Sequence, residues 1–448
     1  MPLKPQPFTA PPSAAQAGQT PSQPTGPRIV IIGGGFAGAN LARTLERYLP
    51  QAQITLLSSE NYITYNPLLP EVVGASVLPS HVVAPLRQMV KRTQVRTVQV
   101  TRIDLAQREV YYQDEEPGVF HYDHVVLAYG CKANLQLVPG MEKHALPLKT
   151  LGDALFLRNR IIARLEQAEL SQDPAMRAWL TTFVVVGGGF SGVEVAGEIN
   201  DFLHTCQRFY HCLARHARVI MVHGGAHLLP ELPERLGLFT DNIMQRRNVE
   251  LHLLARTASV DERGVLLEDG QRIDAGTVIC TIGTRPNSLS DDLPLAKERG
   301  RIKAAADMSV PGHPGVWALG DCAAVMNAYD EKMSPPTAQF AITQAKQLAL
   351  NIARQVRGEV TRPFHYRPKG MMSAVGHNRA VAQVFGIGIS GFIAWLLWRG
   401  YYLLNVPTFS RKARLYLEWN WAMFFPPDTV HLRFTRTERP SVTQEAAD

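Results

Sequence analysis

The feature that most constrains the fold is a glycine pattern that occurs twice. Residues 28–43 read RIVIIGGGFAGANLAR, and residues 181–198 read TTFVVVGGGFSGVEVAGE. In each copy a short β-branched and apolar run precedes glycines spaced G-x-G-x-x-G, and helical apolar spacing follows, which predicts a strand, a tight turn and a helix. One copy is a weak signal, but two copies in this context are strong. The glycines are Gly33, Gly35 and Gly38 in the first copy and Gly187, Gly189 and Gly192 in the second.

Each glycine of this pattern has a physical task in a dinucleotide-binding unit. The first permits the turn, the second lets backbone N–H groups approach a pyrophosphate, and the third lets the helix pack close to the strand. The positive end of the helix then faces the phosphates. The chain therefore predicts two dinucleotide sites.

The remaining pattern predicts α/β architecture with two Rossmann-like dinucleotide-binding domains, since apolar strands alternate with helical segments. A chain of 448 residues is long enough for two or three domains. A helix-like polar stretch, residues 151–173, offers a natural boundary. The expected strands are residues 54–57, 124–128, 183–186, 218–222 and 277–280.

Composition narrows the class of protein. With 46% hydrophobic and 19% charged residues the chain is a folded protein. Its net charge of +7 suits an anionic membrane surface or acidic cofactors, and no Lys/Arg-rich run indicates nucleic-acid binding. The cysteines are scattered and never spaced C-x-x-C, which argues against a metal site or a disulfide framework and favours a reducing compartment. They are Cys131, Cys206, Cys212, Cys280 and Cys322.

The C-terminal part raises the question of a membrane. Residues 380–398 carry no charge, and this segment is just long enough to span a bilayer, but glycines interrupt it. We therefore expect a strand over residues 380–386 and a helix over 392–405, too short to span with Arg399 inside it. Residues 409–425 mix basic and aromatic side chains, which suggests helices lying in a bilayer surface. A buried helix pair or a dimer face is the alternative.

Three further segments fit a cofactor site. YDHVVLAYGCK, residues 122–132, is a strand that ends at Gly130, and TVICTIGTRPN, residues 277–287, repeats this form at Gly283. GVWALGDCAAV places Asp321 after a glycine, where a carboxylate can accept a hydrogen bond from a sugar-alcohol chain. Any one of these could be an ordinary strand end.

In this order the segments resemble the type II NADH:quinone oxidoreductases, within the two-dinucleotide flavoproteins of the glutathione reductase type. The resemblance runs from about residue 28 to 425. It rests on GGGFAG, NYITYNPLLPEV, VVLAYG, VPGMEKHALPLKT, GGGFSGVEVAGE, LLPELPERL, TIGTRPN, GVWALGDCA, PPTAQFAITQA and YRPKGMMSAVGHNRAV.

The resemblance implies a function. The first loop would hold FAD and the second a nicotinamide dinucleotide, so that hydride passes to the flavin and two electrons pass to a membrane quinone without proton pumping. The protein would be peripheral, on the cytoplasmic face of the inner membrane. The sequence leaves a homodimer open. The implied division is a disordered Pro-rich tail over 1–27, an FAD-binding domain over 28–150 and 310–384, an NAD(P)-binding domain over 151–309, membrane-anchoring helices over 385–435, and a polar tail over 436–448.

The resemblance also assigns residues. The first glycine loop, Gly130 and Asp321 would bind FAD. Glu194 matches a glutamate close to the nicotinamide that assists proton handling, and Lys369 a lysine near the flavin. Gln339 matches the glutamine at the quinone head group. Thr343 stands where many relatives have the first glutamine of a pair, which leaves Gln344 alone as a second candidate contact of the quinone. The alternative without a function is a helix-surface carboxylate for Glu194, a polar residue at a helix end for Gln339 and a solvated turn for Lys369.

The sequence departs from the family at the two ribose positions, where an acidic residue usually ends the second strand. Ser58 stands there after the first loop, with Glu60 nearby. His223 stands there after the second, which removes the repulsion of NADPH and, if protonated, would attract its phosphate. NADPH is then accepted or preferred, NADH binds weakly, or the site takes no nicotinamide. Tyr129, in place of a common threonine, would narrow the space beside the FAD.

Two competing functions stay open. A sulfide:quinone oxidoreductase shares the scaffold but needs a redox-active cysteine pair, for which Cys131 and Cys322 are the candidates; both are as easily small apolar fillers. The other is an FAD protein whose nicotinamide site has degenerated.

Overall fold

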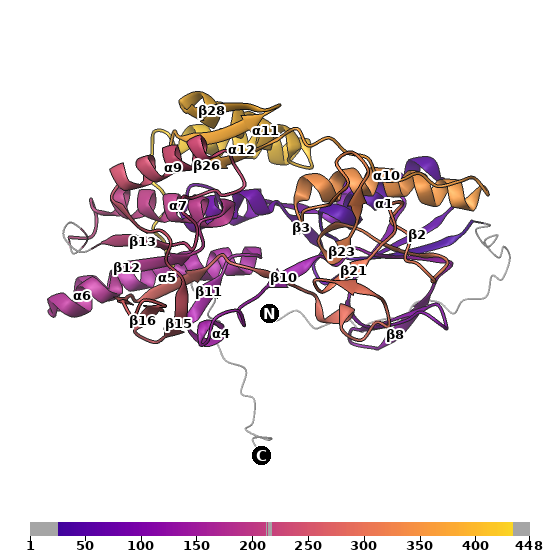
Figure 1. Ribbon diagram of the computed structural model, residues 1–448, viewed down its shortest axis with the longest axis horizontal. Coiled ribbons are helices and arrows are strands. Elements are labelled where there is room, and N and C mark those ends of the chain that lie inside the picture. The colour runs from indigo at the N-terminus through magenta and orange to yellow at the C-terminus, as the bar shows by residue number, and fades with distance from the viewer. Residues whose placement is uncertain (1–25, 212, 214–216, 433–448) are drawn as a thin grey trace, which may run out of the picture.

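The structure is a computed structural model that describes residues 26–211, 213 and 217–432. Its frame is two five-stranded parallel sheets in two units that lie side by side (Figure 1). The expected N-terminal tail, up to residue 25, and the expected polar tail over 436–448 lie outside the described residues.

The first sheet is built around the strand that precedes the first glycine loop. That strand, RIVII, is apolar and almost wholly buried, as a parallel strand covered on both faces must be. Helices α1 (Phe36–Tyr48) and α10 (Ala338–Val356) pack against each other over this unit (Figure 1). The strand order is β22 (Val316–Ala318), β9 (His124–Leu127), β1 (Arg28–Ile32), β2 (Gln53–Ser58), β5 (Gln94–Thr97).

The second sheet repeats this plan around the second loop. All five residues of its central strand are buried. The helices around it are α5 (Leu151–Leu170), α6 (Pro174–Leu180), α7 (Phe190–Cys206) and α9 (Glu234–Arg246). The strand order is β11 (Ala145–Pro147), β18 (Thr277–Cys280), β12 (Thr182–Val186), β13 (Arg218–Val222), β14 (Val249–His252). The five expected strands are confirmed to within one residue at each end.

The internal repeat reaches beyond the glycine loops. In both units a three-stranded antiparallel sheet is inserted just before the strand that returns to the parallel sheet. Sequence reasoning did not find these insertions, because their short strands carry little apolar periodicity. They are β6 (Gln99–Asp104), β7 (Glu109–Gln113) and β8 (Gly118–His121), and β15 (Thr257–Asp261), β16 (Gly264–Leu267) and β17 (Arg272–Asp274).

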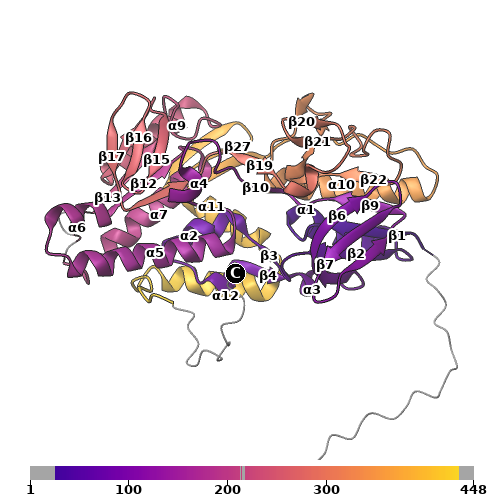
Figure 2. The ribbon, with the colours of Figure 1, turned by 90° about the horizontal axis from the view of Figure 1, so that it is seen from below.

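The chain crosses between the units on a two-stranded ribbon. β10 (Cys131–Ala133) pairs antiparallel with β19 (Thr284–Pro286), between the two units (Figure 2). β11 already pairs with β18, while Leu293 and Ile302 pack in the core of the first sheet. The expected boundaries after residues 150 and 309 therefore do not coincide with the sheets, and we propose that the changeovers lie at β10 and β19.

Smaller elements complete the two units. Among them α2 packs against α5 and α7, so a segment of the first half is buried in the core of the second. This shared core holds the units together. These elements are β3 (Tyr62–Thr64), α2 (Leu69–Val73), β4 (Val83–Pro85), α3 (Leu86–Met89), α4 (Met141–His144), β20 (Lys297–Glu298), β21 (Arg301–Lys303), β23 (Ala323–Ala324), β24 (Met326–Asn327) and β25 (Lys332–Met333).

The C-terminal segment forms a sheet and two helices along the top of Figure 1. The expected strand over 380–386 and helix over 392–405 are found as β27 and α11. The structure adds β28 across the glycine-interrupted stretch, because Gly386, at φ +87°, turns the chain back on itself. No helix in the described part of the chain is both long and apolar enough to cross a bilayer. The elements are β26 (Gly370–Ala374), β27 (Ala380–Val384), β28 (Ile387–Gly391), α11 (Phe392–Asn405) and α12 (Phe409–Trp421).

The close approach at the first glycine loop makes a stability prediction. A Cβ on Gly38 would stand 1.9 Å from the backbone oxygen of Gly33, whereas a Cβ on Gly35 would meet nothing within 4 Å. Gly38→Ala should lower the free energy of unfolding by about 2 kcal/mol, as overpacking does. The control is Gly400→Ala in α11, where a Cβ also meets nothing within 4 Å. It should not lower the free energy of unfolding, because alanine favours a helix more than glycine does. Urea unfolding measures both, and equal losses would contradict the packing argument.

Candidate active site

The main cavity opens where the two units and the C-terminal segment meet. Its volume is about 550 Å³, within the usual range for ligand pockets. Both units contribute to its lining, since residues of the first glycine loop and of α7 face the same space. Its lining includes Gly33, Gly34, Gly35, Ser58, Glu60, Tyr129, Gly130, Cys131, Lys149, Phe190, Glu194, Asp321, Met372 and Tyr402.

In the first glycine loop, backbone atoms pack closely against Gly33, whereas the space in front of Gly35 is open. Gly33 has φ +113°, and a Cβ there would stand 2.4 Å from the backbone oxygen of Ala128. Gly35 has open space in front of it, at the N-terminus of α1. Backbone N–H groups of a first helical turn have no partner within the helix. The loop therefore offers donors for a pyrophosphate.

The two candidate ribose contacts also reach the cavity. Ser58, at the end of β2, is buried, and its hydroxyl accepts a hydrogen bond from the N–H of Glu60 at 3.4 Å. Glu60 is exposed and lines the cavity as well. At the position where an acidic residue usually binds the ribose, this chain thus offers the hydroxyl of Ser58 and the nearby carboxylate of Glu60.

Asp321 lies on a turn that the structure holds firmly. Gly320 has φ +72°, and its N–H donates to Oε1 of Gln344 at 2.8 Å. Oδ2 of Asp321 lies 3.8 Å from Nζ of Lys149 and accepts a hydrogen bond from Cys131 at 3.3 Å. Sequence reasoning missed Lys149, although it stands in the LKT segment directly before α5.

Three expected site residues lie elsewhere. Gln344 is buried and braces the Gly320 turn instead of lining the cavity. Gln339 is half-buried on the first turn of α10; Ala338 and Ala341 line the cavity, but Gln339 does not. Lys369 is exposed just before β26 and is not among the residues that line the cavity.

Glu194 lies inside the cavity wall and is not a surface carboxylate. Its side chain is buried and accepts a hydrogen bond from the N–H of Ala374 at 3.1 Å. Burial raises the pKa of Glu194 to about 8. At neutral pH the carboxyl group therefore carries its proton, which makes it a proton donor within the cavity.

Two more carboxyls, the buried Glu71 and the half-buried Glu198, lie between Glu194 and the C-terminal helices. Glu198 accepts a hydrogen bond from the Ser76 hydroxyl at 2.9 Å, and Glu71 accepts one from the indole N–H of Trp419 at 2.9 Å. Burial raises the pKa of both carboxyls. The three carboxyls thus lie between the cavity wall and α12. No sequence spacing predicts this cluster, because Glu71 lies more than 100 residues before Glu194 and Glu198.

A second cavity, of about 260 Å³, lies beside the second glycine loop. Gly187, at φ +120°, lines it, and a Cβ on Gly192 would stand 1.9 Å from the backbone oxygen of Gly187, as in the first loop. Gly189 is open, with Oε1 of Glu231 3.7 Å from its Cβ position. Gly283 lies outside both linings.

His223 stands at the carboxyl end of β13 and lines the second cavity. Its Nδ1 accepts a hydrogen bond from the N–H of Gly188 at 3.2 Å, and burial lowers its pKa. The ring is therefore neutral at neutral pH. The lowered pKa disfavours the protonated ring through which His223 would attract a phosphate, so only the loss of the repelling carboxylate stays as its expected effect.

The candidate redox cysteines do not form a reactive pair. Burial raises the pKa of both thiols, that of Cys322 to about 12. Cys322 donates a hydrogen bond to the backbone oxygen of Leu127, and neither sulfur is in a disulfide. Since the thiolate is the reactive form, this environment gives no support to sulfide chemistry.

Comparison with known proteins agrees with the fold and the two glycine loops. Residues 27–345 match the pyridine nucleotide-disulphide oxidoreductase family. The type II NADH:quinone oxidoreductase Ndh of Mycobacterium tuberculosis is 33% identical over 96% of this chain and 93% of that protein. The type II NADH:quinone oxidoreductase of Staphylococcus aureus is 28% identical over 81% and 91%.

A solved structure shares the fold over nearly its whole length. NDH2 from Plasmodium falciparum in complex with NADH superimposes with a TM-score of 0.84 at 18% identity, over 90% of this chain and 99% of that one. With the family match and the Mycobacterium tuberculosis relative, this places the chain among the pyridine nucleotide-disulphide oxidoreductases, as a member of the type II NADH:quinone oxidoreductase family.

Proposed function

We propose that the chain is an FAD-dependent NAD(P)H:quinone oxidoreductase that works without pumping protons, on the cytoplasmic face of the inner membrane. The observation that carries the proposal is the main cavity, in which the first glycine loop, the buried Glu194 and Tyr402 of α11 face one space. A nucleotide-binding loop, a proton donor and the apolar C-terminal segment meet there.

The residues of the main cavity fit FAD. The open glycine loop would hold the pyrophosphate, Ser58 and Glu60 the adenosine ribose, and Asp321 the sugar-alcohol chain. When bound, FAD would supply the chemistry that takes a hydride from the nicotinamide and passes two electrons to the quinone. The second cavity fits the adenosine end of the nicotinamide dinucleotide, and the Plasmodium falciparum relative is known in complex with NADH.

The chain itself would handle position, charge and protons. Glu194 holds a proton at its carboxyl group, at a pKa near working pH, as an efficient general acid does. Lys149, not Lys369, would bring positive charge beside Asp321. Phe190, Met372 and Tyr402 would exclude water from the reacting groups.

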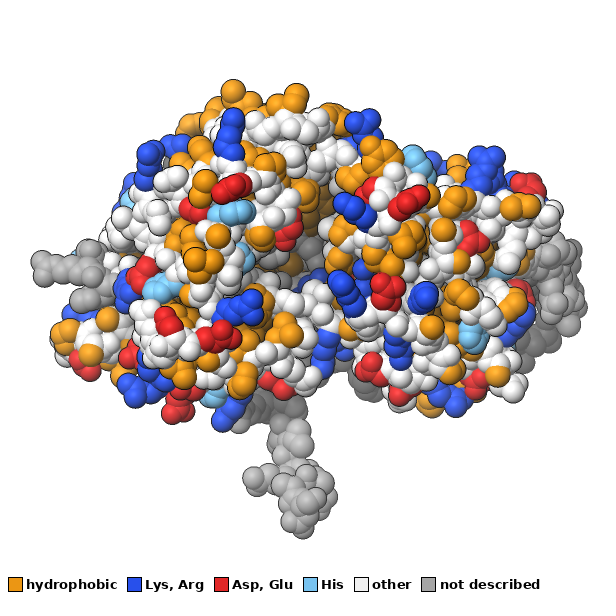
Figure 3. Space-filling view, in the orientation of Figure 1, with side chains coloured by type: hydrophobic (Ala, Val, Ile, Leu, Met, Phe, Trp, Pro, Cys, Tyr) orange, Lys and Arg blue, Asp and Glu red, His pale blue; other side chains and the backbone are white. Residues whose placement is uncertain are grey.

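The C-terminal segment supports docking on a lipid surface. Large apolar side chains are exposed in both helices and the hairpin before them, and Figure 3 shows hydrophobic side chains along the upper edge of the molecule. A patch of this kind marks an interaction surface, and three basic residues of α12 suit anionic headgroups. A homodimer face is the alternative. The exposed residues include Phe385, Ile387, Phe392, Ile393, Leu404, Phe409, Leu417, Trp421 and Phe424.

Substitution of the buried acid tests the proton role. In Glu194→Gln the side chain keeps its shape but carries no proton to donate. Flavin reduction by the nicotinamide should change less than about threefold, while reoxidation by quinone should slow on the order of 100-fold. Anaerobic stopped-flow absorbance measures the two half-reactions separately, so the first is the control for the second.

The proton role of Glu194 also predicts the direction in which the reoxidation rate changes with pH. Because the pKa of Glu194 is raised to about 8, the donor is loaded below this pH and lost above it. Reoxidation in the unsubstituted protein should slow as pH rises through about 8, and Glu194→Gln should lose this step. Equal profiles in both proteins would remove Glu194 from the proton path.

Vesicle binding tests the docking surface. Leu417 and Phe424 are 67% and 78% exposed in the C-terminal segment. Replacing both by glutamate should reduce co-flotation with anionic vesicles at least tenfold, because each buried apolar side chain contributes about 2 kcal/mol. Leu170→Glu, at the end of α5 and 80% exposed, is the matched control and should float normally. If the control detaches equally, or the double variant floats as before, the surface lies elsewhere.

A further inference from the structure

The second cavity carries an inference about the electron donor, which rests on the proposed function. The adenosine ribose of a dinucleotide lies at the carboxyl end of the second parallel strand of its unit, here β13. A carboxylate usually stands there and repels a 2′-phosphate. In this chain His223, Gly224 and Gly225 follow β13.

His223 can accept a hydrogen bond from the glycine loop, as a carboxylate at this position could, but it carries no negative charge. Its Nδ1 accepts the hydrogen bond from Gly188 in the glycine loop, so the ring proton stands on Nε2. Nε2 is buried and has no hydrogen-bond partner among the described residues. The loop is therefore braced by a neutral group, and nothing at this residue repels a phosphate.

Arg256 supplies the positive charge at this position. Its Nε and Cγ lie 3.6 and 3.4 Å from the Cβ position of Gly224, and no other residue except the chain neighbours of Gly224 comes within 4 Å. Backbone hydrogen bonds from Ala255 to His223 and from Leu254 to Gly225 hold the two segments together. Over residues 26–211, 213 and 217–432, no carboxylate lies within ion-pair distance of this guanidinium.

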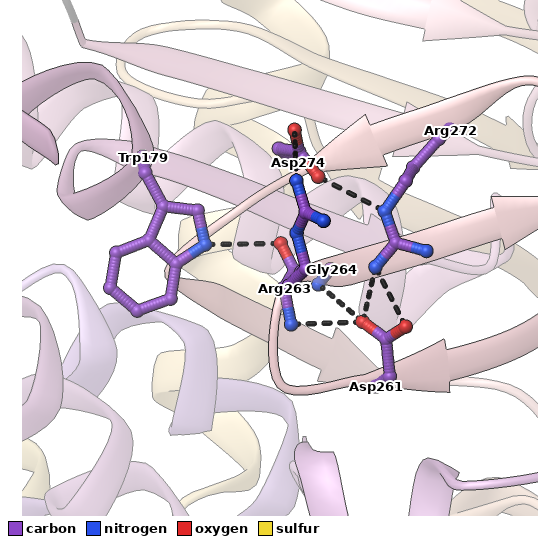
Figure 4. Close-up of polar contacts among 6 residues, drawn as sticks. All are labelled: Trp179, Asp261, Arg263, Gly264, Arg272 and Asp274. Atoms are coloured by element: carbon purple, nitrogen blue, oxygen red, sulfur yellow. Dashed lines mark hydrogen bonds and ion pairs between the residues drawn. The ribbon is translucent and has the colours of Figure 1, made fainter. Parts of the chain in front are cut away.

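The hairpin that begins next to Arg256 is fixed at its other end. Arg272 binds both carboxylate oxygens of Asp261 and also Asp274, and the indole N–H of Trp179 donates to the backbone oxygen of Arg263 at 3.0 Å (Figure 4). β15 runs directly from this braced turn back to Thr257, beside Arg256. The backbone that carries Arg256 is thus held at both ends, while its side chain is exposed and has no ion-pair partner among the described residues.

Glu268 is the competing residue. It lines the same cavity and its N–H donates to the backbone oxygen of Arg256, so it could accept the 2′-hydroxyl of NADH instead. However, its side chain does not come within 4 Å of the Cβ position of Gly224, the residue that follows His223 at the carboxyl end of β13. Arg256 is therefore closer than Glu268 to the expected position of the ribose.

We propose that this cavity is a 2′-phosphate subsite in which Arg256 binds the adenosine 2′-phosphate, so that NADPH is the preferred electron donor. Arginine suits this task because its guanidinium fork matches a phosphate in two parallel hydrogen bonds. Thr257 also lines the cavity, and its buried hydroxyl has no hydrogen-bond partner among the described residues.

The direct test measures binding without turnover. Isothermal titration calorimetry on the holoenzyme should show adenosine 2′,5′-bisphosphate binding at least tenfold more tightly than 5′-AMP. Arg256→Ala should abolish this preference, Arg256→Lys should keep part of it, and Glu268→Gln, the matched control in the same cavity, should retain it. Tight binding of 5′-AMP that is lost in Glu268→Gln would overturn the proposal in favour of NADH.

Reduction of the bound flavin distinguishes this inference from the proposed function. Faster reduction by NADPH than by NADH, reversed in Arg256→Ala, supports both. Faster reduction by NADH overturns the 2′-phosphate subsite and leaves the oxidoreductase assignment standing. Reduction by neither nucleotide, in protein whose thermal unfolding is normal, overturns both.

Discussion

Both candidate sites depend on how closely a helix can approach the turn before it. In each unit the third glycine of the loop faces the backbone oxygen of the first at a distance that a Cβ cannot occupy. Because only glycine allows this contact, α1 and α7 begin directly at the carboxyl edges of their sheets, and the first residues of both helices line the main cavity. The same close approach, made once in each unit, thus fixes where each proposed nucleotide site can lie.

The link between the units is the second constraint. α2 leaves the first half of the chain and packs among α5, α7 and the C-terminal helices. This packing buries the carboxyls of Glu71 and Glu194 and half-buries that of Glu198, and Glu194 faces the main cavity. Buried acids stay protonated because the low-polarity surroundings disfavour their charge. The same core that joins the units thus keeps a proton source beside the proposed reaction.

The sequence predicted what depends on local pattern. The strands, the two glycine turns and the helix over 392–405 follow from periodicity and glycine spacing, and the structure confirms them. Family motifs also pointed to Ser58, Glu194 and Asp321, which do line the main cavity.

The positions of Gln344 and Lys369 depend on tertiary neighbours, which a sequence pattern does not show. Gln344 carries the right chemistry for a quinone, but the face of α10 it occupies turns it toward Gly320. Lys369 lies outside the cavity lining because it precedes β26 on the exposed side. Lys149 and Arg256 were missed because their contacts, with Asp321 and with Gly224, join residues that are far apart in the sequence. A single charged residue in a loop gives no pattern from which such a contact can be inferred.

The most direct test of the account is an anaerobic titration of the purified protein, followed through the absorbance of its bound flavin. The account predicts that the protein retains FAD, that a nicotinamide nucleotide bleaches it, and that a short-chain quinone then restores its colour. Protein without FAD, or flavin that dithionite reduces but neither NADH nor NADPH does, would contradict the account.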